Sequence, residues 1–238
     1  MTLKQYWRES RNFSLNVAFA FPALLVYELG CWVLGPRVRN GAQLLLRELF
    51  LEIGPLGVHL LNALLIAAAV VCVWEAWKRF DHLPARFSFL LLECLGYAAL
   101  LGPLVLLLEA PLVRMATLVA GPGGTLGTAL EKLVLALGAG VYEELFFRLL
   151  LMSAVFHVVF GLFKEARWAA AAVALLVSAV FFALCHHDLI LVGGEPFVPR
   201  VFLFRTLAGV VLGLVFYLRG FAAAVYTHAL YNLLLFLR

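Results

Sequence analysis

Long apolar stretches alternate with short polar connections along almost the whole chain. About 20 mostly apolar residues cross the hydrocarbon core of a bilayer, so each stretch of that length predicts a membrane helix. Seven such segments are present: Phe13–Leu34, Val58–Trp77, Phe87–Leu108, Leu133–Phe163, Trp168–Cys185, Val201–Leu218 and Phe221–Leu237. Lipid offers no hydrogen-bond partner to an open backbone, so each segment must be helical. The pattern predicts an all-α, polytopic transmembrane helix bundle of about seven membrane helices, within a range of about six to eight.

The fourth segment is longer than a bilayer requires. As a straight helix it would extend roughly 46 Å, against a hydrocarbon core of about 30 Å. We therefore expect it to tilt, bend or project from the bilayer, with Gly138 and Gly140 as bending points. A shorter stretch, residues 40–53 (NGAQLLLRELFLEI), mixes leucines with one arginine and two glutamates. That mixture predicts an interfacial helix.

Composition supports the membrane assignment. The chain has 238 residues, of which 65% are hydrophobic and 13% charged, whereas soluble domains have about 25% charged residues. The formal net charge is +4, but the basic residues lie mostly between the apolar runs, where they contact lipid headgroups. This placement predicts the lipid bilayer as a partner and no nucleic acid. We see no linker, low-complexity stretch or repeat, so residues 1–238 are expected to form a single membrane domain.

Charged residues inside the apolar segments indicate function, because a charge at the bilayer centre costs about 2.5–3.5 kcal/mol on insertion scales. Glu28 and Glu93 lie well inside such segments, and Glu143, Glu144 and Arg148 form a denser group in the fourth segment. Glu144 and Arg148 are four residues apart, so they share a helix face and can form an ion pair. Glu143 is rotated by about 100° and needs another environment, as a general base would. A helix-locking ion pair with a spare acid is the structural alternative.

Two later segments contribute hydrogen-bonding groups at membrane depth. Phe182 and His186 share a face at the end of the fifth segment, and His228 and Asn232 share a face of the last. Taken singly, they could be an interfacial histidine and an interhelical hydrogen-bonding pair. Together with Glu143 they could meet in one cavity and hydrolyse an amide. The glutamate would take a proton from water, one histidine would orient that water or protonate the leaving amine, and the other histidine and the asparagine would stabilise the oxyanion.

The three motifs resemble a known family. Glu-Glu-x-x-x-Arg, Phe-x-x-x-His and His-x-x-x-Asn, in this order on apolar helices, resemble the CPBP family of CAAX proteases and bacteriocin-processing enzymes, also called the Abi family. The resemblance covers residues from about Lys132 to Arg238, which places the catalytic core at about residues 130–238. It implies an intramembrane endopeptidase of the glutamate type that uses no metal and no other cofactor.

The resemblance also implies a role for each residue of the motifs. Glu143 would activate water together with His186, Glu144 would pair with Arg148, and His228 with Asn232 would stabilise the oxyanion. Many family members have a small residue after the arginine, where this chain has Leu149. This departure affects the local packing of the helix rather than the chemistry.

The substrate is open, because the first 130 residues carry no motif that matches the family. The expected partner is a membrane-anchored or lipid-linked protein or peptide. Prenylated CAAX proteins, bacteriocin leaders and anchored sorting tails all fit, and the last would be similar to a myxosortase-like branch. We expect a multi-pass protein of the bacterial inner (cell) membrane.

Three other functions remain as alternatives. Glu143, His186 and His228 could form a His₂Glu zinc site, although no H-E-x-x-H motif is present. Intramembrane acids and histidines also occur in proton- or ion-coupled transporters, but transporters commonly have internal repeats. The third alternative is a scaffold that binds a membrane segment without cutting it.

Overall fold

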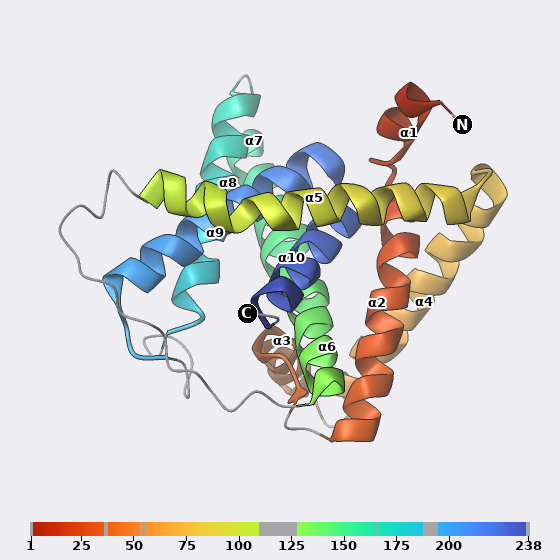
Figure 1. Cartoon of the computed structure of the whole chain (residues 1–238), viewed down its shortest axis with the longest axis horizontal. Helices are drawn as coiled ribbons and strands as arrows, with labels where there is room; N and C mark the ends of the chain where they lie inside the picture. Colours follow the sequence, from red (N-terminus) through yellow and green to blue (C-terminus); the bar gives the residue numbers. More distant parts are fainter. Residues whose placement is uncertain are drawn as a thin grey trace.

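The computed structural model describes residues 2–35, 38–52, 54, 56–109, 128–164, 166–187 and 195–236. Within these residues the chain is a helix bundle, and the only β pairing is an isolated bridge between His187 and Glu195. The helices are α1 (Leu3–Glu9), α2 (Phe13–Leu34), α3 (Gly41–Leu51), α4 (Gly57–Arg79), α5 (Leu83–Glu109), α6 (Ala129–Gly138), the π-helix η2 (Ala139–Met152), α7 (Ser153–Leu162), α8 (Arg167–Leu184), α9 (Pro199–Arg219) and α10 (Phe221–Phe236) (Figure 1). The all-α prediction is confirmed.

Six helices in the described part of the chain are long and apolar enough to cross a membrane. They are Phe13–Leu34, His59–Arg79, Leu83–Leu108, Ala129–Leu162, Arg167–Leu184 and Pro199–Arg219. The seventh predicted segment is also a helix, Phe221–Phe236, but it is shorter than the others. The chain is therefore a polytopic helical membrane protein, as predicted. The helix predicted within residues 40–53 is present as α3, and its position at the membrane interface stays a prediction.

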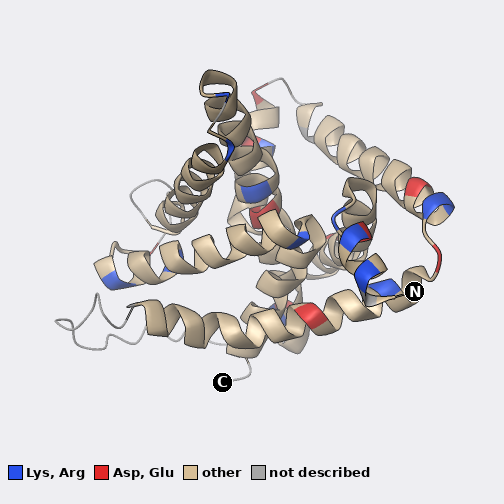
Figure 2. Cartoon of the chain, turned by 90° about the horizontal axis from the view of Figure 1, so that it is seen from above, with Lys and Arg blue, Asp and Glu red and all other residues tan. Residues whose placement is uncertain are grey.

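Large apolar side chains cover the outside of the bundle. Trp32, Trp74, Trp77 and Trp168 are all more than half exposed, and many leucines of the long helices are exposed as well. Figure 2 shows that charged residues are sparse along these helices. A surface of this kind is unfavourable in water and favourable in lipid, which supports the membrane assignment.

The short helix α10 lies at the centre of the bundle. It packs against α2, α5, α6, α9 and η2, and every residue from Phe221 to Ala229 is buried. Four of these nine residues are alanines, which let neighbouring helices approach closely. Figure 1 shows α10 in the middle of the molecule. This helix carries His228, which is buried, and Asn232.

The long fourth segment changes helix type at its glycines. α6 ends at Gly138 and η2 begins at Ala139. Gly138 packs on the ring of Tyr27, and a Cβ atom on Gly140 would lie only 2.5 Å from the carbonyl oxygen of Val225. Both glycines therefore serve close helix contacts. Further along, Gly209 packs against Ala179 of α8.

Glu93 of α5 has a buried partner that the sequence did not suggest. Arg219, at the end of α9, is 3% exposed and donates from Nε and Nη2 to the two oxygens of Glu93. Tyr6 and Tyr97 donate their hydroxyls to the same carboxylate, and Arg219 Nη1 donates to Ser10. This network ties the N-terminal helix α1 to α5 and α9, so Glu93 has a structural role.

Candidate active site

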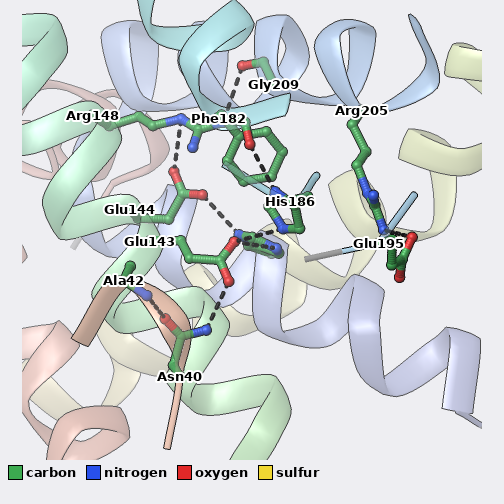
Figure 3. A network of polar contacts seen from close by, with 11 residues as sticks. Asn40, Ala42, Glu143, Glu144, Arg148, Phe182, His186, Glu195, Arg205 and Gly209 are labelled. Atoms are coloured by element: carbon green, nitrogen blue, oxygen red, sulfur yellow. Dashed lines mark hydrogen bonds and ion pairs between the residues drawn. The ribbon is translucent and has the colours of Figure 1, made fainter. Parts of the chain in front are cut away.

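The two carboxylate oxygens of Glu143 have different surroundings (Figure 3). Oε1 accepts a 2.7 Å hydrogen bond from Nδ2 of Asn40. Oε2 is buried and has no hydrogen-bond partner among the described residues. It lies 3.6 Å from Nε2 of His186 and 3.9 Å from Nε2 of His228. Glu143 therefore has one oxygen held in place and one oxygen free to act beside two imidazole rings.

Glu144 is more deeply buried than Glu143 and is bound on both sides. Its side chain has no exposed surface, and its Oε1 lies 2.8 Å from Nδ1 of His228. Its Oε2 lies 3.2 Å from Nε of Arg148, within ion-pair distance but not aligned as a hydrogen bond. Arg148 also donates to the carbonyl of Gly209 at 3.2 Å and lies 4.4 Å from the ring centre of Phe182. The predicted ion pair of Glu144 and Arg148 is present.

The π-helix explains why two adjacent glutamates can reach the same histidine. Glu143, Glu144 and Arg148 all lie in η2 (Ala139–Met152). A π-helix has i→i+5 hydrogen bonds and more residues per turn than the 3.6 of an α-helix, so neighbouring side chains are rotated less from each other. Both carboxylates consequently face His228, one near each ring nitrogen. On an α-helix the two side chains would lie about 100° apart, so this shared partner could not be predicted from the sequence.

The ring of His186 is oriented by a backbone carbonyl. Its Nδ1 lies 2.7 Å from the carbonyl oxygen of Phe182, one helical turn earlier. A carbonyl can only accept a hydrogen bond, so Nδ1 carries the hydrogen. In the neutral ring Nε2 is then an acceptor, and it is this atom that faces Glu143 Oε2. Phe182 also packs against the rings of His186 and His228, which fixes their relative position.

A cavity of about 290 Å³ joins these groups. Four of the predicted residues line it: Glu143, His186, His228 and Asn232. The other two, Glu144 and Arg148, lie behind the wall and are fully buried. Most of the remaining wall is apolar and comes from α5, α9 and α10. The six predicted residues therefore come together from two helices, η2 and α10, and from the turn that follows α8. The cavity can hold a substrate group beside Glu143 and both histidines.

Asn40 is part of the site, although no motif in the sequence marks it. It caps α3 through a 2.8 Å bond from the backbone N–H of Ala42 to its Oδ1, and its own backbone N–H donates to the hydroxyl of Tyr27. The Tyr27 hydroxyl donates to Gln43, which donates to Glu28. Asn40 is thus fixed at two points while its amide reaches Glu143. An asparagine at the start of a predicted helix is a favourable cap, but nothing in the sequence links Asn40 to Glu143.

Glu28, the remaining intramembrane acid noted in the sequence, belongs to the same network. Its Oε1 accepts hydrogen bonds from Gln43 and from the hydroxyl of Tyr142, which directly precedes Glu143. Glu28 therefore connects α2, α3 and η2 behind the site. Among the described residues, no group of three histidines, cysteines or acids is arranged to hold a metal ion.

The fold and the site together define a class: a polytopic integral membrane protein with acid–base groups around a cavity inside its helix bundle. Residues 125–234 match the family model described as Type II CAAX prenyl endopeptidase Rce1-like. This match bears out the predicted resemblance of residues 130–238 to the CPBP family. The family indicates an intramembrane protease of the CAAX type. No curated protein and no solved structure matches the chain.

Proposed function

We propose that the protein is an intramembrane endopeptidase that hydrolyses a peptide bond with water activated by Glu143. One observation carries the proposal: Glu143 Oε2 is buried, has no hydrogen-bond donor among the described residues, and faces Nε2 of both His186 and His228 on the cavity wall. A water molecule that donates to Glu143 and to His186 would satisfy both acceptors. It would then be held beside a base, in a cavity that can admit a substrate.

The proposed reaction begins with proton transfer from this water to Glu143. The resulting hydroxide forms a bond to the carbonyl carbon of the scissile amide, and the carbonyl oxygen becomes an oxyanion. Glu143 then gives its proton to the amide nitrogen, the C–N bond breaks as the oxyanion reforms the carbonyl, and a carboxylic acid and an amine are formed. The acid passes its remaining proton to the amine, so that a carboxylate and an ammonium group are released. His186 orients the water through Nε2, because its other nitrogen is engaged with Phe182.

His228 and Asn232 are proposed to stabilise the oxyanion. His228 has a carboxylate near each ring nitrogen, and a doubly protonated ring can donate to Glu144 from Nδ1 and into the cavity from Nε2. Asn232 lines the same cavity one helical turn later and can supply an amide N–H. Arg148 balances the charge of Glu144, so that Glu144 can fix the ring of His228.

The proposed substrate is a membrane-anchored or lipid-linked protein or peptide, and the proposed location is the inner membrane of a bacterium. The cavity wall supports a substrate of this kind, since it is apolar apart from the reacting groups, Arg205 and Tyr231. Proteomics of cells that produce either the wild-type protein or Glu143→Gln tests the proposal. We expect the variant cells to accumulate membrane-anchored proteins that keep a terminal segment. Identical sets of termini in the two cell lines would count against a protease.

Replacing His228 or Asn232 with alanine should separate catalysis from helix packing. Loss of one oxyanion donor lowers kcat by about 10²–10³ with little change in substrate binding. A hydrogen bond between membrane helices contributes only about 1 kcal/mol of stability. We therefore expect Asn232→Ala to lose turnover at an almost unchanged thermal midpoint, measured in detergent. Near-normal kcat with a lowered midpoint would instead make the residue structural.

Changing Asn40 to aspartate should lower the rate of cleavage. Aspartate keeps the helix cap of α3 but places a second carboxylate beside Glu143 Oε1 in place of an N–H donor. Glu143 then loses the hydrogen bond that holds Oε1, and the two carboxylates repel each other. We expect kcat/KM to fall by about 10-fold or more. Asn40→Ser, which also keeps the cap but carries no charge, is the matched control and should show a smaller loss.

The groups that face Glu143 in this experiment are His186, His228 and Arg205 on the cavity wall and Glu144 with Arg148 behind it. The same groups surround Glu143 in both variants, so the difference between Asp and Ser reports the added charge. Equal kcat/KM values for the wild type and both variants would show that Asn40 does not act on the base.

A further inference from the structure

Arg205 of α9 lines the cavity together with Glu143, His186, His228 and Asn232. It is the only lysine or arginine in the cavity wall that the described residues form. Its side chain is 21% exposed, and its Nη2 lies 2.9 Å from Oε2 of Glu195. Nothing in the reaction proposed above uses this guanidinium, so its position in the wall calls for another role.

Only one side of this guanidinium is occupied. Glu195 binds Nη2, and the side chain of Glu195 is 54% exposed. Nη1 is buried and has no hydrogen-bond partner among the described residues. A buried donor of a charged group is costly to leave unpaired. The geometry therefore favours a ligand that accepts from Nη1 inside the cavity.

The residues of the cavity wall around Arg205 favour a carboxylate as the ligand. A planar guanidinium matches a carboxylate in shape and charge better than any neutral acceptor. The apolar residues beside Arg205, among them Val201, Phe204 and Ala208, weaken competition from water and strengthen such a pair. Without a cation, the negative charge of Glu143 would repel a carboxylate from the cavity. Arg205 would offset that repulsion and fix the distance between the carboxylate and Glu143.

We propose that Arg205 is a specificity-determining residue that binds a carboxylate of the substrate, either the C-terminal carboxylate of the chain or the side chain of an Asp or Glu close to the scissile bond. The proposal rests on the proposed function, because it places the carboxylate in the cavity where cleavage occurs. The substrate would carry a negative charge on the part that lies next to α9 in the cavity. The two sources of the carboxylate share one chemistry and are separated by the probes below.

Three synthetic peptides test the proposal. They have the same sequence apart from one aspartate in the third, and each contains an S-prenylated cysteine followed by three residues. This design follows the description of the matching family model as a CAAX prenyl endopeptidase. One peptide ends in a free carboxylate, the second in an amide, and the third in an amide preceded by an aspartate. Each is assayed with the wild type, Arg205→Gln, Arg205→Lys and the control Glu195→Gln, all checked for an unchanged thermal midpoint.

The wild type should cleave at least one carboxylate peptide with a kcat/KM about 10- to 100-fold above that of the neutral amide, mainly through KM. Arg205→Gln should lose this preference, and Arg205→Lys should keep a smaller part of it. Glu195→Gln should retain it, because Glu195 contacts Nη2 whereas the substrate carboxylate accepts from Nη1. A preference for the free acid alone identifies the C-terminus, and a preference for the aspartate identifies a side chain. An unchanged preference in Arg205→Gln overturns the proposal.

Binding measured without turnover separates this inference from the proposed function. The dissociation constants of the same peptides are measured for Glu143→Gln and for Glu143→Gln combined with Arg205→Gln. A carboxylate preference that disappears with Arg205 supports the site even where the wild type cleaves none of the peptides, and only the hydrolytic function then fails. Equal affinities of acid and amide for the Glu143→Gln protein overturn the carboxylate site, whatever the outcome for cleavage.

Discussion

Purified Glu143→Gln protein is expected to bind its substrate and to cleave none of it. Glutamine keeps the shape of the side chain and can still contact Asn40, but it cannot take a proton from water. The barrier to attack should therefore rise while helix packing is unchanged. Single-turnover cleavage, substrate affinity and thermal midpoint in detergent are the measurements, and we expect only cleavage to change.

Glu75→Gln is a suitable control for the effect of replacing a glutamate with glutamine outside the site. Glu75 lies on α4, is 39% exposed and pairs with Arg79 on the same helix. It does not line the cavity, and surface pairs of this kind contribute little to stability, so this variant should retain normal cleavage. Turnover by Glu143→Gln close to that of the control would exclude Glu143 as the base.

Arg148→Ala should produce the largest loss of stability among the site variants. Arg148 and Glu144 have fully buried side chains, and removing one partner of a buried ion pair costs about 3–5 kcal/mol because the other charge is left uncompensated. Cleavage should fall as well, because Glu144 would no longer be held against His228. The thermal midpoint and cleavage rate of the purified variant, both in detergent, test this expectation.

The double variant Glu144→Gln with Arg148→Met separates stability from activity. Replacing both charges by uncharged side chains of similar size removes the uncompensated charge, so much of the lost stability should return. Cleavage should stay low, because His228 has then lost the carboxylate at Nδ1. Should Arg148→Ala keep its stability and lose only activity, Arg148 would have a direct part in the reaction.

Local patterns in the sequence predicted the elements well. The apolar run from Phe13 to Leu34 has the bounds of α2, because a membrane helix begins and ends where its apolar residues do. Glu144 and Arg148 could be paired for the same reason, since residues four apart on a helix are neighbours. The motif residues could be assigned to one site only through the resemblance to a family.

Contacts between distant parts of the chain were not predictable. Arg219 contacts Glu93 across 126 residues, and Asn40 contacts Glu143 across 103. No periodicity links such positions, because the pairing depends on how the helices pack. The π-helix could not be predicted either. The fourth segment is apolar over its whole length, so its pattern does not distinguish the i→i+5 hydrogen bonds of a π-helix from those of an α-helix.

The bond from Asn40 to Glu143 has a consequence for protein engineering. A graft of residues 125–234 onto a different set of membrane helices would carry Glu143, His186, His228 and Asn232, but not the amide that holds Oε1 of the base. The host would have to supply a hydrogen-bond donor within reach of Glu143 Oε1. That donor would have to lie at the first residues of a helix that is held as firmly as α3 is held by its Asn40 cap. Exchange of the first helices between relatives should therefore succeed best when the connection between α2 and α3 is exchanged with them.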